Sequence, residues 1–147
     1  MKELGRILLA EDDQRDIDLT LAALEEINLM NKVDVVNNGE EALDYLFTRK
    51  SYKNRTTGNP LVVMLDLKMP KVDGMEVLEQ IKENKNLKTI PVVILTSSKM
   101  EKDLLTSYNL GANAFIIKPV HFEEFIKTIK EVGAFWAILN ETPEKQE

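Results

Sequence analysis

The stretch LVVMLD at residues 61–66 decides the fold, because five apolar residues in a row lead directly to a single acid. A run of that length is too short for a buried helix, and unbroken apolarity is typical of a strand covered on both faces of a parallel sheet. Pro60 precedes the run and Pro70 follows it, so breakers bound it on both sides. The stretch therefore predicts a buried strand that carries Asp66 at its carboxyl end.

Four more short apolar runs indicate the rest of the sheet. They lie at residues 7–10, 33–36, 92–95 and 114–117, and the run at 33–36 is the most polar, which suits an edge strand. Apolar residues three or four apart predict helices around 17–27, 40–47, 77–81, 104–108 and 121–132. Strand and helix alternate five times, which predicts an α/β fold with a doubly wound parallel sheet and helices on both faces. The polar segment 50–60 is long for a loop in this architecture, and we expect a tolerated surface insertion.

Composition narrows the function classes. The chain of 147 residues predicts one domain, and the absence of cysteine excludes disulfide scaffolds, thiol catalysis and Cys-based metal centres. A single histidine leaves no His-rich metal cluster, and a net charge of −6 disfavours non-specific binding to nucleic acid or anionic membranes. Neither a signal peptide nor a spanning apolar segment is evident, so we expect a cytoplasmic protein.

Polar residues of complementary chemistry follow the predicted strands. Ligands of open α/β sheets bind beyond the carboxyl ends of the strands, and the residues found there are Glu11, Asp12, Asp13, Asp66, Thr96 and Lys118. A cluster of carboxylates without imidazole or thiolate suits a hard cation, Mg²⁺ or Mn²⁺. With a hydroxyl and an ammonium beside the acids, the set suits phosphoryl transfer onto an aspartate, with Asp66 as the attacking carboxylate.

Taken one at a time, these residues have simpler explanations. An acid at a strand end commonly caps the next helix, and we favour that role for Asp13 over metal binding. Thr96 alone is an ordinary strand residue, and Lys118 alone is most often a surface charge. His121, at the start of the last helix, is interpreted as an exposed first-turn residue rather than a phosphorelay histidine. The joint occurrence at successive strand ends carries the functional interpretation.

Several ordered motifs resemble the bacterial response-regulator receiver domain (CheY-like) over about residues 5–132. They are ILLAEDD at 7–13, LDLKMP at 65–70 with Asp73-Gly74, ILTS at 94–97, Gly111-Ala112 and Ile117-Lys118-Pro119. The resemblance implies a flavodoxin-like sheet of strand order 2-1-3-4-5 and a phosphoprotein that takes a phosphoryl group from a sensor histidine kinase. It also implies a cis peptide bond between Lys118 and Pro119.

The same resemblance assigns roles by position. Asp66 is expected to be the phosphoacceptor, and Mg²⁺ is expected to be held by Asp12, Asp66, the backbone carbonyl of Lys68 and, mainly through water, Glu11. Thr96 and Lys118 are expected to bind phosphoryl oxygens.

Two departures from the family pattern matter, one at the switch and one beside the phosphoacceptor site. Thr96 and Phe115 occupy the switch positions, where Phe115 replaces the more usual tyrosine and lacks its hydroxyl. Lys68 and Ser98 hold the positions that tune the lifetime of the phosphoryl group, so that lifetime is left open.

The end of the chain suggests a type of regulator. We expect a single receiver domain over residues 1–140 and a disordered polar tail over 141–147, which leaves no room for an output domain. The segment 50–60 and Phe135-Trp136 resemble stand-alone regulators of bacterial and cyanobacterial phytochrome kinases. A helix beyond Val132 would overhang the sheet with apolar side chains, so we expect a homodimer that includes Phe135, Trp136 and Leu139.

Two other functions compete with the phosphorylated switch. One is a receiver-like scaffold or dimerisation module that binds partners constitutively, with little phosphorylation. The other is a flavodoxin-like cofactor protein, but acids follow the first strand where a flavin phosphate would need donors, and no glycine-rich phosphate motif is present. The intact set Asp12, Asp66, Thr96 and Lys118 favours the phosphorylated switch.

Overall fold

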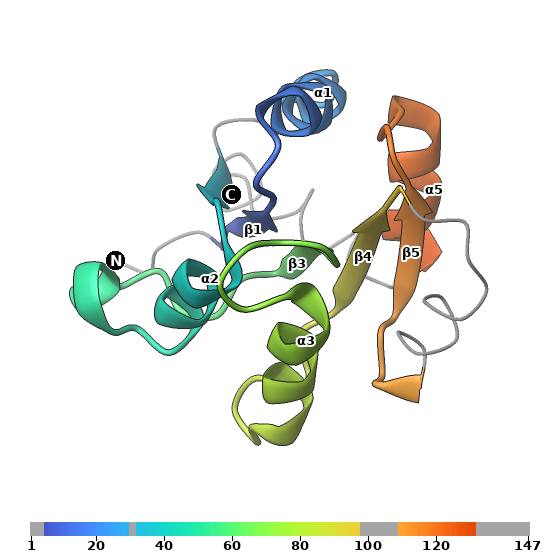
Figure 1. The fold of residues 1–147 in the computed structure, drawn as a ribbon. Coiled ribbons are helices and arrows are strands. Elements are labelled where there is room, and N and C mark those ends of the chain that lie inside the picture. Colours follow the sequence, from blue (N-terminus) through green and yellow to red (C-terminus); the bar gives the residue numbers. More distant parts are fainter. Residues whose placement is uncertain (1–4, 30–31, 98–108, 132–147) are drawn as a thin grey trace.

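The computed structural model describes residues 5–29, 32–97 and 109–131, which form a parallel five-stranded sheet (Figure 1). The strand order is β2-β1-β3-β4-β5, and every neighbouring pair is parallel, as predicted. The strands are β1 (Ile7–Ala10), β2 (Val33–Val36), β3 (Val62–Asp66), β4 (Val92–Thr96) and β5 (Ala114–Ile117). Strands β3 and β4 extend one residue further than their apolar runs, so Asp66 and Thr96 are the last residues of their strands.

Helices cover both faces of the sheet, with α1 and α5 on one side and α2 and α3 on the other (Figure 1). They are α1 (Gln14–Glu25), α2 (Gly39–Leu46), α3 (Gly74–Glu83) and α5 (Phe122–Glu131), and a short 3-10 helix, η2 (Lys50–Tyr52), follows α2. Four of the five predicted helices are therefore confirmed. The helix predicted around 104–108 lies outside the described residues.

The sheet separates two hydrophobic cores. Alternate residues of the strands point to opposite faces, so Leu8 and Leu65 pack against α2 and α3 while Leu9 and Met64 pack against α1 and α5. The residues of β1, β3 and β4 are all buried. Burial on both faces explains why these strands read as continuous apolar runs rather than as alternating ones.

Three helices, α1, α2 and α3, begin at a polar residue that caps their first turn. The side chain of Asp13 accepts a hydrogen bond from the amide of Asp16, which confirms its predicted role as the N-cap of α1. Asn38 and Asp73 cap α2 and α3 in the same way. Because Asp13 caps α1, Glu11 and Asp12 remain at the carboxyl end of β1.

The edge strand β2 is supported by a polar network rather than by apolar packing alone. Asp34 accepts hydrogen bonds from the Arg6 guanidinium and from the hydroxyl of Tyr45, which is itself buried. The segment after α2 folds over the same tyrosine, since the Arg55 guanidinium lies 4.2 Å from the Tyr45 ring centroid and donates to its carbonyl oxygen. The predicted surface insertion is thus an ordered loop with its own contacts.

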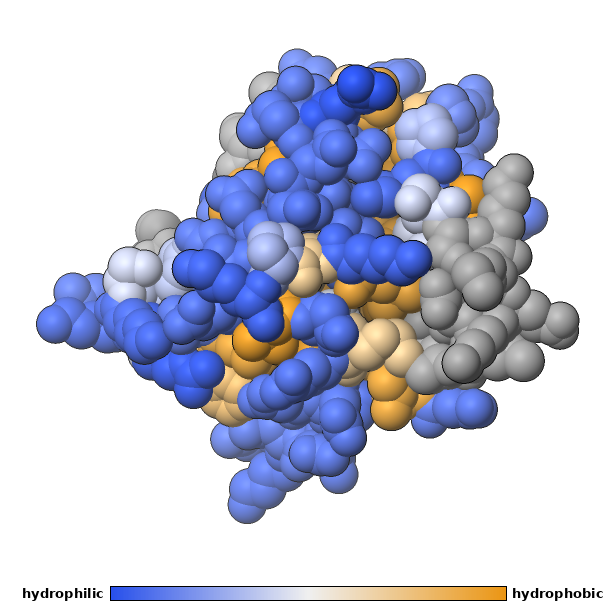
Figure 2. All heavy atoms as spheres, viewed as in Figure 1, coloured by the Kyte–Doolittle hydropathy of each residue, from blue (hydrophilic) through white to orange (hydrophobic). Residues whose placement is uncertain are grey.

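The outer surface is mainly polar. In the view of Figure 2, hydrophilic side chains cover the outside of the helices, and apolar side chains reach the surface chiefly in the middle of this face. In the described ranges no helix has both the length and the apolarity that a bilayer crossing requires.

Candidate functional site

The functional side chains meet at the carboxyl edge of the sheet. Glu11 directly follows β1, Asp66 ends β3, and Lys118 directly follows β5. The ammonium of Lys118 lies 3.1 Å from Glu11 Oε1 and 3.4 Å from Asp66 Oδ1. Residues 107 positions apart in the sequence thus touch, as the predicted crevice requires.

Three carboxylates form a compact cluster at this edge. Oxygen atoms of Glu11, Asp12 and Asp66 all lie within 4.8 Å of one another. The Glu11 side chain is fully buried and Asp66 is 4% exposed, whereas Asp12 is open to solvent. The cluster therefore has a buried floor and one exposed wall.

Burial disfavours the charged forms of Glu11 and Asp66. Burial raises the pKa of Glu11 to about 7, and the neighbouring charge of Asp66 adds to that rise. Burial also raises the pKa of Asp66, although Lys118 and the backbone amide of Lys68 act in the opposite direction. Buried carboxylates that repel one another are relieved by a cation, and oxygen donors suit a hard one. The residues present therefore fit Mg²⁺ or Mn²⁺, as predicted.

Lys118 is an inward-facing lysine and not the surface charge that its type alone would suggest. Its side chain is 9% exposed, and the peptide bond to Pro119 is cis, as predicted. Burial alone would lower the pKa of Lys118, but the surrounding carboxylates outweigh it and raise the pKa above its ordinary value. The lysine is thus held in its charged form.

One of those carboxylates was not singled out from the sequence. Asp16, in the first turn of α1, places Oδ2 2.9 Å from Lys118 Nζ, which is the shortest of the three ion pairs that Lys118 forms with the described residues. An acid at this helix position ordinarily indicates a favourable charge near the positive end of the helix dipole. Its contact with Lys118 becomes visible only when β5 is placed beside α1.

A glycine fixes the loop that follows β3. The amide of Gly74 donates to the carbonyl oxygen of Leu67, and a Cβ at Gly74 would collide with the carbonyl oxygen of Asp66. The first turn of α3 therefore packs directly against the backbone of Asp66. This contact gives the Asp-Gly pair at 73–74 a structural reason.

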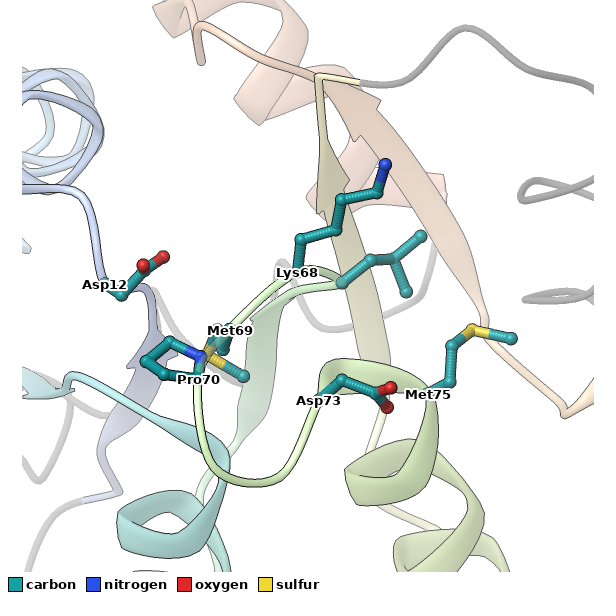
Figure 3. Close-up of a pocket in the computed structure, with 7 residues that line it drawn as sticks. Asp12, Lys68, Met69, Pro70, Asp73 and Met75 are labelled. Carbon is teal, nitrogen blue, oxygen red and sulfur yellow. The ribbon is translucent and has the colours of Figure 1, made fainter.

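A cavity of about 450 Å³ opens beside the acids (Figure 3). Asp12 forms one wall and Met75 of α3 the opposite one, with the loop after β3 between them. Its lining residues are Asp12, Leu67, Lys68, Met69, Pro70, Asp73 and Met75. The exposed wall of the carboxylate cluster thus faces an open cavity.

Of the other residues singled out from the sequence, some lie within the described ranges and some lie outside them. Thr96 is 2% exposed at the end of β4, beside Ile117 of β5, and Phe115 is half-buried against the core under α2 and α3. His121 is exposed just before α5, in agreement with its simpler interpretation. Ser98, Phe135, Trp136 and Leu139 lie outside the described residues.

Comparison with known proteins identifies the arrangement. The family model described as "Response regulator receiver domain" matches residues 7–130. The solved structure of the bacteriophytochrome response regulator AtBRR is 57% identical, with a TM-score of 0.83, and the match covers 91% of this chain and 96% of that one. The bacteriophytochrome response regulator RtBRR is 52% identical, with a TM-score of 0.85 and coverage of 97% and 86%.

A cyanobacterial regulator is also similar. Response regulator Rcp1 of Synechocystis is 35% identical over 130 residues, which is 88% of this chain and 87% of Rcp1. A structure of the Mn²⁺-bound form of Rcp1 matches with a TM-score of 0.74 at 34% identity, and the match covers 90% of this chain and 94% of that one. A receiver-type regulator with this fold therefore accepts the class of cation that the carboxylate cluster fits.

Proposed function

The chain belongs to the response regulator receiver domain family, and from that premise we propose that it is a phosphorylation-switched regulator of a two-component system. One observation carries the proposal. A buried aspartate at a strand end, Asp66, lies against an ammonium, Lys118, and in a cluster of carboxylates beside an open cavity. A nucleophile, a charge partner and an entry path thus occur together.

In the proposed reaction, an oxygen of the Asp66 carboxylate attacks the phosphorus of a kinase phosphohistidine. A P–O bond forms, the P–N bond breaks, and its electron pair returns to the imidazole, which takes up a proton. The ammonium of Lys118 neutralises one phosphoryl oxygen. Glu11, Asp12, Asp66 and the backbone carbonyl of Lys68 would hold Mg²⁺, which would neutralise charge on the phosphoryl group.

The same residues support hydrolysis of the phosphoryl-aspartate, which ends the signal. Water attacks the phosphorus, the P–O bond to Asp66 breaks, and orthophosphate leaves while the carboxylate is restored. The chain thus catalyses its own phosphorylation and dephosphorylation and is a phosphoacceptor signalling protein rather than an enzyme with an external product.

Two buried or half-buried residues suit the readout of that state. The hydroxyl of Thr96 lies at the end of β4, where it can donate to a phosphoryl oxygen, and Phe115 lies on the neighbouring β5. We propose that Thr96 shifts toward the phosphoryl group and that Phe115 repacks in response. Without a phenolic hydroxyl, Phe115 is held inward by packing alone.

The partner we propose is a phytochrome-type histidine kinase, because AtBRR and RtBRR are bacteriophytochrome response regulators. We also propose a cytoplasmic location, as expected from the sequence. We further propose one receiver domain over residues 1–140, a polar tail over 141–147, and a homodimer that includes Phe135, Trp136 and Leu139. Sedimentation of the wild type and a Phe135→Ala/Trp136→Ala variant tests the dimer, and a monomeric wild type at micromolar concentration would contradict it.

A direct test uses acetyl phosphate and Mg²⁺ with the whole chain. The wild type is expected to take up close to one acid-labile phosphate per chain, and Asp66→Asn is expected to take up none. Asp44→Asn is the matched control, since Asp44 is also a buried aspartate but pairs with Arg49 on the other side of the sheet. Absence of uptake in the wild type would favour the alternative of a constitutive scaffold, and uptake by Asp66→Asn would overturn the assignment of Asp66 as the phosphoacceptor.

A further inference from the structure

The contacts of Lys118 divide its charge between three carboxylates. An ammonium has three N–H donors, and the described partners are Asp16 at 2.9 Å, Glu11 at 3.1 Å and Asp66 at 3.4 Å. The phosphoacceptor is thus the most distant partner. A phosphoryl oxygen on Asp66 would take over the donor that faces Asp66, and it would then share the ammonium with the two nearer carboxylates.

The three partners differ in how easily they can be released. The Glu11 side chain is fully buried, so bulk water cannot replace Lys118 as its partner. Asp66 is the residue that carries the phosphoryl group and stays in place. The side chain of Asp16 is 23% exposed, so water can solvate it after release.

Asp16 is also held in a fixed position. Its backbone amide donates to the side chain of Asp13, and its carbonyl oxygen accepts from the hydroxyl of Thr20, which is buried. Both contacts use backbone atoms of Asp16, which leaves its carboxylate for Lys118. The carboxylate therefore pulls the ammonium toward α1 and away from β3.

From these contacts we propose that Asp16 is a positioning residue that competes with the phosphoryl group for Lys118. In the unphosphorylated protein it holds the ammonium on the α1 side, and on phosphorylation it releases Lys118 and becomes hydrated. The competition weakens binding of the phosphoryl group by Lys118. It also couples phosphorylation of Asp66 to the first turn of α1. The inference rests on the proposed function and adds a residue that the family assignment does not supply.

The test measures binding of beryllium fluoride, a mimic of the phosphoryl group on a carboxylate, by calorimetry at saturating Mg²⁺. Asp16→Asn removes the charge but keeps the size and both backbone contacts. Its affinity for beryllium fluoride is expected to rise about tenfold, because a hydrogen bond between charged groups contributes on that order. Asp16→Ser is a second variant in case the amide replaces the lost ion pair with a hydrogen bond.

Two further variants separate this role from a structural one. Asp18→Asn removes one charge from the same helix, but Asp18 is exposed and bonds to Gln14, so its affinity should stay within about twofold of wild type. Asp16→Glu restores the charge and should bring the affinity back toward wild type. A general change of charge or of helix stability would not produce this pattern.

The outcomes are distinct. Unchanged or weaker binding in Asp16→Asn and Asp16→Ser, or equal tightening in Asp18→Asn, overturns the competition. A wild type that takes no phosphate from acetyl phosphate overturns the proposed function instead, and the beryllium fluoride series still reports on Asp16. Tighter binding in both Asp16 variants alone, with recovery in Asp16→Glu, supports the inference.

Discussion

Neighbouring aspartates at the end of β1 should respond to alanine substitution in opposite ways. Asp12 is an exposed member of the carboxylate cluster, and Asp13 is the N-cap of α1. Asp12→Ala should abolish the response to Mg²⁺ and leave the fold intact. Asp13→Ala should weaken the fold and leave the response to Mg²⁺ intact.

The magnitudes follow from the contacts. Loss of an N-cap side chain costs about 1 kcal/mol, which for a chain of this size lowers the melting temperature by roughly 4 °C. Asp12 is exposed, so its replacement should change the metal-free free energy of unfolding by no more than about 0.5 kcal/mol. At a free Mg²⁺ concentration of 100 times Kd, binding stabilises a protein by about 2.7 kcal/mol. Loss of a direct ligand should weaken binding by about a hundredfold or more, since loss of groups that only support ligands already costs 10–100-fold.

Urea denaturation with and without Mg²⁺ measures these free energies of unfolding on the same samples. The backbone amide of Asp13 also donates to Glu11, and alanine keeps that amide, so Asp13→Ala should retain the cluster. The metal assignment is refuted if Mg²⁺ stabilises Asp12→Ala as much as the wild type. It is also refuted if Asp13→Ala is the variant that loses the metal response.

Three further predictions concern the scaffold. Burial raises the pKa of Asp34, but hydrogen bonds from Arg6 and Tyr45 outweigh it and hold that pKa below its ordinary value. Asp34→Asn should therefore cost about 1 kcal/mol at pH 7, and urea denaturation should show that the difference begins to shrink as the pH falls below about 4 and vanishes only below the lowered pKa of the folded chain. Gly74→Ala should destabilise the chain by about 1–3 kcal/mol in urea, because the new methyl group meets backbone atoms, and equal or higher stability would contradict the tight packing. Arg55→Ala should speed proteolysis of the loop at 47–60, because it removes the ring contact and the bonds to the Tyr45 carbonyl oxygen, whereas the exposed control Lys53→Ala should be cleaved at the wild-type rate.

The sheet and most of its site could be predicted from the sequence because both depend on local patterns. A strand buried on both faces must be apolar throughout, so the run at 61–65 identified β3 without any knowledge of its neighbours. The chain then leaves each parallel strand at the same edge, which is why Glu11, Asp66 and Lys118 could be assigned to one crevice. The polar character of 33–36 likewise indicated the edge strand β2.

Tertiary structure alone decided which of these charges are paired. The same letter, Asp, stands at positions 12, 13 and 16, yet one is an exposed cluster member, one caps a helix and one binds Lys118. The local sequence already favoured the cap role of Asp13, whereas the contact of Asp16 depends on the distant strand β5, which brings Lys118 beside it. Burial also acts only in the folded chain, where the loss of water raises the pKa of Glu11. Local preference therefore determined the elements, and long-range contact and desolvation determined the chemistry at their ends.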